Sequence, residues 1–101
     1  MNLNQNKNHK TKNSRQLEKH FKGISNHRRI DMLMLIYGKP GLTLDQICEN
    51  LDCNYQTLAE HSSRLVRAGL VSKKKMGNNA EHSITPYGKK ICKFIEDFRW
   101  N

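Results

Sequence analysis

The amino-acid sequence predicts a mainly helical domain with one small β-hairpin, built from about five helices and two to three short strands. Apolar residues recur at spacings of three and four over most of the chain, as they do on the buried face of a helix. Capping and stop residues divide this pattern into separate helices. Near residues 70–85 the spacing changes to alternation around a Gly- and Asn-rich turn, which indicates a hairpin.

The first helix is predicted over residues 15–24. Ser14 can cap its start, and Leu17 and Phe21 recur at helical spacing on one face. Gly23 is expected to interrupt this helix, because glycine is a poor helix former. The residues before it are rich in Asn and Lys and almost free of apolar side chains. We therefore expect residues 1–13 to be a disordered basic tail and residues 14–101 to form a single domain.

The second and third helices follow in a short interval. Residues 27–37 are apolar on most helical faces, which predicts a helix central to the core, and residues 38–41 contain the Gly and Pro that end it. Thr43 and Gln46 have the spacing of a capping box, in which each side chain satisfies the other residue's amide. The third helix is then expected to run to about Leu51.

A turn over residues 52–54 precedes the fourth helix, predicted at about 55–68. Asn54 is expected to tolerate unusual backbone angles and to cap this helix. One face of the helix is apolar apart from Ser62, and the opposite face is polar. The apolar face is formed by Tyr55, Leu58, Ala59, Ser62, Leu65 and Val66.

Two strands and a last helix complete the chain. Residues 70–75 and 82–85 are expected to pair around residues 76–81, where Gly77-Asn78-Asn79 can supply positive backbone angles. Thr85 followed by a proline marks the start of the last helix. Its apolar stripe is formed by Tyr87, Ile91, Phe94, Ile95 and Phe98.

Charge favours a polyanionic partner. The chain has 18 Lys and Arg against 9 Asp and Glu, a formal charge of +9, and from Arg64 to Lys93 eight basic residues stand against the single acidic Glu81. No apolar run approaches the roughly 20 residues that span a bilayer. The N-terminus has no apolar core typical of a secretory signal, so we expect a cytoplasmic protein with no membrane partner.

The segment from residue 42 to residue 88 resembles the winged helix-turn-helix of ArsR-type and MarR-type transcription regulators. The resemblance is carried by Thr57-Leu-Ala-Glu-His61, by Leu65 with Ala68-Gly-Leu-Val71, and by Ile84-Thr-Pro-Tyr-Gly88, in that order and spacing. Together with an apolar helix resembling the family's buried one, the match covers roughly residues 26–92. It implies regulation of transcription by binding double-stranded DNA.

The chain departs from the family pattern at two places. Ser62 stands where the family usually has a buried apolar residue, which would leave room for a larger neighbour such as Tyr55 or require a satisfied hydroxyl. The Cys-x-Cys pair of arsenical-type metal sensors is absent at the recognition helix. The resemblance therefore does not carry metal sensing with it.

Helix 55–68 is the expected reader of the major groove, because such a helix needs polar side chains that reach base edges. The candidate base-contacting residues are Gln56, Thr57, Glu60, His61 and Arg64. The wing at about 72–84 is expected on phosphates or in the minor groove, with Lys73 and Lys75 pointing to one side of the strand and Lys74 to the other. The candidate backbone contacts are Thr43, Asn54, Tyr55, Arg67, Lys73, Lys74, Lys75, Asn78 and Asn79. The alternative interpretation is an ordinary solvated helix face and a lysine-protected strand edge.

Homodimerisation is expected because one recognition helix reads too few base pairs for useful specificity. The candidate interface residues are Leu17, Phe21, Ile91, Phe94, Ile95, Phe98 and Trp100. These side chains could instead cover the core of the monomer. A second functional hypothesis is a protein-interaction module that uses the C-terminal apolar helix, since fold does not fix function.

The sequence favours neither a metal site nor an enzyme. Cys48 and Cys53 are spaced just outside the usual zinc window, and with Cys92 they make an odd number, so free thiols are expected. Metal sensing and thiol redox sensing remain as lesser alternatives. There is no Gly-rich phosphate loop and no nucleophile-plus-base signature, so neither a cofactor, a small-molecule substrate nor catalysis is predicted.

Overall fold

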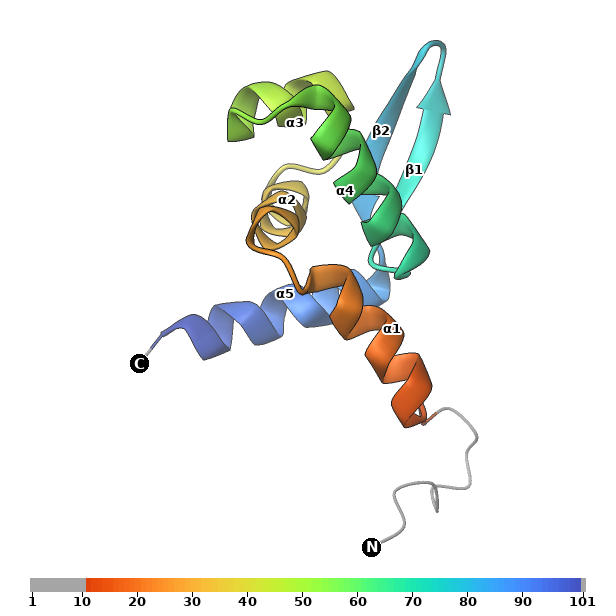
Figure 1. Ribbon diagram of the computed structural model, residues 1–101, viewed down its shortest axis with the longest axis vertical. Helices are drawn as coiled ribbons and strands as arrows, with labels where there is room; N and C mark the ends of the chain where they lie inside the picture. The colour runs from red at the N-terminus through yellow and green to blue at the C-terminus, as the bar shows by residue number, and fades with distance from the viewer. Residues whose placement is uncertain (1–10, 101) are drawn as a thin grey trace, which may run out of the picture.

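The computed structural model describes residues 11–100, which form five helices and a two-stranded antiparallel hairpin (Figure 1). This confirms the predicted fold class. Residues 1–10 of the predicted tail, and residue 101, lie outside the described residues. The elements are α1 (Ser14–Ile24), α2 (His27–Gly38), α3 (Leu44–Leu51), α4 (Tyr55–Arg67), β1 (Val71–Met76), β2 (Asn79–Ile84) and α5 (Pro86–Arg99).

Helix α2 lies at the centre of the fold and packs against all four other helices and against β2 (Figure 1). It buries Met32, Leu33 and Ile36 completely, as its apolar composition predicted. Its neighbours contribute the rest of the core, which includes Ile47, Leu58, Leu65, Ala68, Leu70, Val71 and Cys92. No helix between residues 11 and 100 is long and apolar enough to cross a membrane.

The first helix and its N-cap each begin one residue earlier than predicted. Asn13, not Ser14, is the N-cap: its side chain accepts a hydrogen bond from the Gln16 amide at 2.9 Å, and the Gln16 side chain accepts one from the Asn13 amide at 2.9 Å. The Lys12 ammonium lies 3.9 Å from the centre of the Tyr87 ring. Residues 12 and 13 therefore contact the domain.

Gly23 does not interrupt α1, contrary to the prediction. The helix continues through it to Ile24, and Gly23 is buried where α1 crosses the end of α4. A Cβ at this position would collide with the Ala68 Cβ. The glycine is needed for the close approach of two helices.

The helix-turn-helix formed by α3 and α4 has the predicted capping box between Thr43 and Gln46. The left-handed residue in the turn is Asp52, with φ of 50°. Asn54 instead has φ of −62° and caps α4 by accepting a hydrogen bond from the Thr57 amide at 3.1 Å.

The hairpin that forms the wing is longer than predicted, because β2 begins at Asn79. Met76 pairs with Asn79, so the turn has two residues, and Gly77 alone takes a positive φ of 62°. At the base of the wing, Leu42 forms an isolated bridge with His82. This bridge supplies the minimal third strand of the predicted two to three.

Candidate nucleic-acid interface

The polar face of α4 is exposed at four of the five residues predicted to contact bases: Gln56, Thr57, Glu60 and Arg64. The Glu60 carboxylate accepts a hydrogen bond from Arg64 Nε at 3.1 Å, and Arg67 Nη2 lies 3.8 Å from the same oxygen. These side chains are more than half exposed, and such helix pairs stabilise by only about 0.3–0.5 kcal/mol. Both ion pairs are therefore weak, and the two guanidinium groups remain accessible to solvent.

His61 is not on the exposed face, which corrects its predicted position. It is 9% exposed, and its Nδ1 lies 3.4 Å from Arg29 Nη1. Burial, with smaller effects from the charges of Arg29 and Arg64, lowers the pKa of His61 below its ordinary value. Leu58, His61 and Leu65 are separated by three and four residues, so the spacing itself could have assigned the imidazole to the buried face.

Arg29 was predicted only as part of the buried helix. In the structure it connects the end of α1 with His61 on α4. Its Nε donates to the Gly23 carbonyl at 2.6 Å, and Nη2 donates to the Lys22 carbonyl at 3.4 Å. Burial lowers the pKa of its guanidinium. A cation at the C-terminal end of α1 is favourable for the helix dipole. Arg29 thus holds α1 against His61 and α4.

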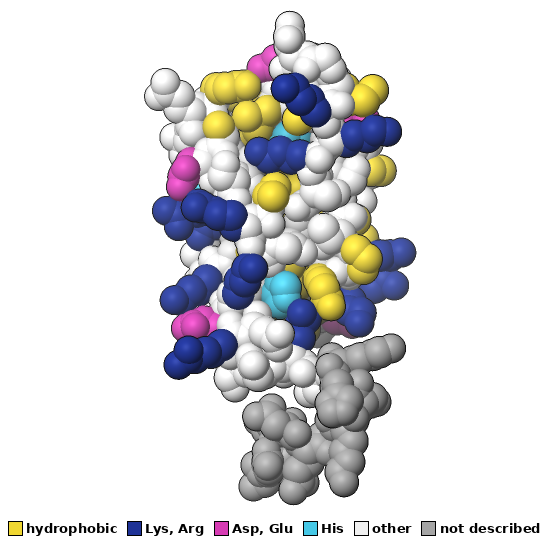
Figure 2. Space-filling view, turned by 90° about the vertical axis from the view of Figure 1, so that its right-hand side faces the viewer, with side chains coloured by type: hydrophobic (Ala, Val, Ile, Leu, Met, Phe, Trp, Pro, Cys, Tyr) yellow, Lys and Arg dark blue, Asp and Glu magenta, His cyan; other side chains and the backbone are white. Residues whose placement is uncertain are grey.

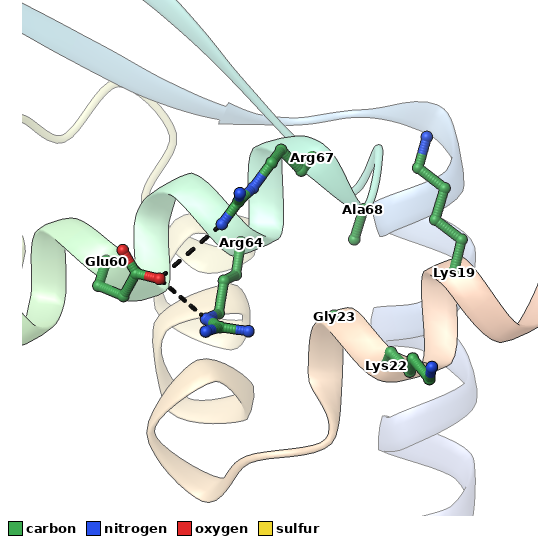
Figure 3. A pocket seen from close by; sticks show the side chains of 7 residues that line it. All are labelled: Lys19, Lys22, Gly23, Glu60, Arg64, Arg67 and Ala68. Carbon is green, nitrogen blue, oxygen red and sulfur yellow. Dashed lines mark hydrogen bonds and ion pairs between the residues drawn. The ribbon is translucent and has the colours of Figure 1, made fainter.

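A groove of about 400 Å³ separates α1 from the second half of α4. Figure 3 shows Glu60 between Arg64 and Arg67 on the α4 side, with two lysines on the α1 side. We call this feature the α1–α4 groove; its lining is Lys19, Lys22, Gly23, Glu60, Arg64, Arg67 and Ala68. Lys19 and Lys22 were not among the predicted contacts, because nothing in their local sequence indicates that α1 crosses α4.

A second hollow, of about 370 Å³, lies between the wing and the first residues of α3 and α4. This wing hollow brings together five of the nine predicted backbone contacts, namely Tyr55, Lys73, Lys75, Asn78 and Asn79, beside Leu44, Asp45, Ala80 and His82. Lys74 is paired in register with Glu81 on the other face of the hairpin. The predicted alternation of the three lysines is therefore confirmed.

The remaining predicted backbone contacts, Thr43, Asn54 and Arg67, lie at helix ends. Thr43 and Asn54 are the N-caps of α3 and α4, where unpaired amides and the helix dipole favour anions. Their side-chain oxygens already accept capping bonds, so either side chain would meet a phosphate only as a donor. Arg67 lines the α1–α4 groove instead.

Lysine and arginine side chains outnumber acidic ones on the face shown in Figure 2, which is the right-hand side of Figure 1. This face includes the wing and the side of α1. Clustered cations of this kind are the electrostatic footprint expected of a nucleic-acid-binding surface.

Ser62 is fully buried, and its hydroxyl lies 2.9 Å from His82 Nε2. Of the two expectations for this position, the satisfied hydroxyl is confirmed. Tyr55 does not fill the space, because its side chain is half exposed in the wing hollow.

The predicted dimer-interface residues lie in three settings: against the core, exposed on the surface, and in a hollow between α1 and α5. Ile91 and Ile95 pack against the core, so the alternative of covering the monomer applies to them. Phe98 and Trp100 are 79% and 78% exposed, and Phe94 stacks on Phe98 with ring centres 5.5 Å apart. Leu17, Phe21 and Ile91 also line an apolar hollow of about 410 Å³ between α1 and α5.

The three cysteines are free thiols. Cys48 Sγ donates to the Cys53 carbonyl at 2.7 Å, and burial raises the pKa of Cys92 to about 11. Among residues 11–100, no group of three or more His, Cys, Asp and Glu could hold a metal ion. The buried Cys92 is poorly suited to thiolate chemistry.

No protein-family model and no curated protein sequence matches this chain. Solved structures do resemble it. HlyU from Vibrio cholerae has a TM-score of 0.77 and 22% sequence identity, over 86% of this chain and 95% of HlyU. The transcriptional repressor PagR of Bacillus anthracis has a TM-score of 0.72 and 20% identity, over 80% of this chain and 93% of PagR.

A third structure is the homodimeric winged helix-turn-helix DNA-binding domain of Mb0332 from Mycobacterium bovis, a possible ArsR-family transcriptional regulator. It has a TM-score of 0.76 and 19% identity, over 84% of this chain and 79% of that one. These likenesses span nearly all of the described helices and the wing. The chain therefore has the winged helix-turn-helix fold that its sequence resemblance implied.

Proposed function

We propose that this protein binds double-stranded DNA in a sequence-specific manner and regulates transcription, with α4 in the major groove and the wing on phosphates. One observation carries the proposal: the exposed polar face of α4 is flanked by two cationic depressions. The wing hollow lies at its N-terminal end and the α1–α4 groove at its C-terminal half. The fold shared with HlyU, PagR and Mb0332 supports the same conclusion.

Within this proposal, the exposed polar face of α4 reads bases. Gln56 can bond adenine bidentately, and Arg64 can bond guanine once it leaves Glu60. Thr57 and Glu60 are exposed beside them. His61 has a supporting role, because its buried ring faces Arg29 and not the solvent.

Phosphate binding is proposed for Lys73 and Lys75, which line the wing hollow, and for Arg67 in the α1–α4 groove. Asn78 and Asn79 extend this surface to the turn of the wing. Lys74 lies on the opposite face and is not expected to share those phosphates. Each phosphate neutralised should add about −0.9 to the slope of log affinity against log salt.

A homodimer is proposed through α1 and α5, since Phe94, Phe98 and Trp100 remain exposed in the monomer. The homodimeric state of the Mb0332 domain supports this arrangement. Two recognition helices would require half-sites about 34 Å apart. Light scattering at micromolar concentration should give twice the mass of the chain; a monomer would contradict the dimer.

The proposed function is tested by selecting bound sequences from random duplex DNA and measuring their affinity. Arg64→Ala should lower affinity for the selected site and relax the preference at one base pair. Lys73→Ala should weaken selected and unrelated duplexes equally, because phosphates carry no sequence information. Lys74→Ala is the matched control on the other face of the strand.

The second candidate function is a protein-interaction module, favoured by the exposed aromatic side chains of α5. Charge reversal at Arg64 and Lys73 should abolish DNA binding if the first proposal holds. If the second holds, partner binding should instead depend on Phe94 and Phe98. A protein that captures a partner normally after Phe98→Ser would contradict the second proposal.

A further inference from the structure

A buried hydrogen bond joins the helix proposed to read bases to the wing. Ser62 on α4 is 0% exposed and His82 on β2 is 1% exposed. The Ser62 hydroxyl lies 2.9 Å from His82 Nε2, and His82 Nδ1 lies 3.1 Å from the Leu42 carbonyl. Both ring nitrogens of one histidine therefore have partners, on two different parts of the fold.

The chemistry of these partners determines which atom donates in each of the two hydrogen bonds. A carbonyl can only accept, so His82 Nδ1 must carry a proton and donate to Leu42. In the neutral ring Nε2 is then an acceptor, and Ser62 donates its hydroxyl proton to it. Burial lowers the pKa of His82, which favours the neutral ring. An alanine at position 62 would leave Nε2 without its donor.

His82 is also a backbone junction. Its amide donates to the Leu42 carbonyl at 2.9 Å, and its own carbonyl accepts from the Gly41 amide at 2.8 Å. The residue thus connects β2, the segment before α3, and α4. It is the outermost buried residue of the wing, since every residue from 72 to 79 is exposed. Beyond His82, the wing therefore has no fully buried residue.

The two lysines of the wing hollow, Lys73 and Lys75, lie on β1 at and just beyond His82. Lys73 is the register partner of His82, and Lys75 is two residues further out on the same strand face. The Met76–Asn79 pair lies three residues beyond, about 10 Å at 3.4 Å per residue. A tilt of about 10° at the junction would move Lys75, two residues out, by about 1 Å and the Met76–Asn79 pair by about 2 Å, and the larger displacement is more than a hydrogen bond to a phosphate tolerates.

We propose that the Ser62–His82 hydrogen bond is a positioning contact that sets the angle between α4 and the wing. It would thereby match the base contacts of α4 to the phosphate contacts of Lys73 and Lys75. Ser62 and His82 are positioning residues on this account, because neither side chain can reach DNA. The inference rests on the proposed DNA-binding function and adds the residues that determine its geometry.

The first test needs no DNA. Residual dipolar couplings and backbone order parameters of β1 and β2, referred to α4, are measured for the wild-type protein and Ser62→Ala. The variant should show a reoriented or more mobile hairpin. Cys92→Ala, which also shortens a buried side chain but lies on α5, is the control and should leave the hairpin unchanged. A Ser62→Ala hairpin with wild-type orientation and order would overturn the proposal.

The second test is a double-mutant cycle on the selected duplex, below the melting temperature of every variant. Ser62→Ala should weaken binding about tenfold, comparable to losing one charge-assisted contact, and should flatten the salt slope. In a Lys73→Ala/Lys75→Ala background its effect should fall below about twofold, since the contacts it positions are gone. Equal weakening in both backgrounds would overturn the positioning role.

Failure of the two ideas can be told apart. If the wild-type protein binds no duplex, the proposed function fails, and the dipolar couplings alone decide whether Ser62 orients the wing. If the protein binds DNA but Ser62→Ala behaves like Cys92→Ala, only the positioning role fails.

Discussion

Gly23→Ala should destabilise the protein, although alanine is a better helix former than glycine. Gly23 lies in the last turn of α1, where the substitution gains at most about 1 kcal/mol of helix propensity. Its Cβ, however, would collide with the Ala68 Cβ. That methyl is fixed to the backbone and cannot turn away, and overpacking of this kind costs about 1–3 kcal/mol. The cost of the clash should exceed the gain in helix propensity, so that the free energy of unfolding falls by about 1 kcal/mol.

The assay is thermal and urea denaturation followed by circular dichroism. A loss of 1 kcal/mol should lower the melting temperature by about 4–8 °C in a domain of this size. Gly38→Ala at the end of α2 is the matched control, because a Cβ there meets nothing within 4 Å; it should be neutral or stabilising. A Gly23→Ala protein as stable as the wild type would refute the close approach of α1 and α4.

Three further predictions concern pH, the wing and the apolar face of α5. Burial lowers the pKa of His61 and His82. At mildly acidic pH the two imidazoles therefore bind protons more readily in the unfolded chain than in the folded one. Stability should be complete above about pH 6.5 and decline as pH falls below it; a urea midpoint unchanged between pH 7.5 and 5 would contradict this. Lys73→Ala removes one phosphate contact from each subunit of a dimer and should reduce the salt slope of DNA binding by about two, whereas Lys74→Ala should change it less, and equal effects would count against the observed strand faces. Phe98→Ser should shift a dimer toward monomer in sedimentation and should lower the melting temperature only through the lost association, because the ring is 79% exposed in the monomer.

Local chemistry made much of this fold predictable. The capping box of Thr43 and Gln46, the Thr85 cap of α5 and the alternation of the wing lysines each depend on residues close in sequence. Their interactions are formed within one element or one hairpin. The sequence therefore contains nearly all the information that specifies them.

Two of the errors arose where distant elements meet. Gly23 looked like a helix breaker because its partner, Ala68, is 45 residues away on α4. Lys19 and Lys22 were missed for the same reason, since only the crossing of α1 and α4 brings them to Arg64. His61 is different: its spacing from Leu58 and Leu65 indicated burial, and its polar character was given too much weight.

The departure at Ser62 shows how a local anomaly can point to a distant partner. A polar side chain on an apolar helix face requires a hydrogen bond, and that requirement was evident from the sequence. The identity of the partner, His82, was not, because the pairing depends on where the wing folds back onto α4.

Whether α4 and the wing bind duplex DNA is decided by the salt dependence of affinity for a selected sequence. If Arg67, Lys73 and Lys75 each neutralise one phosphate in both subunits of a dimer, log affinity should fall with log salt at a slope of about −5. The selected sequences should share a two-fold symmetric site. A flat salt dependence, or selection that enriches no sequence, would contradict the account.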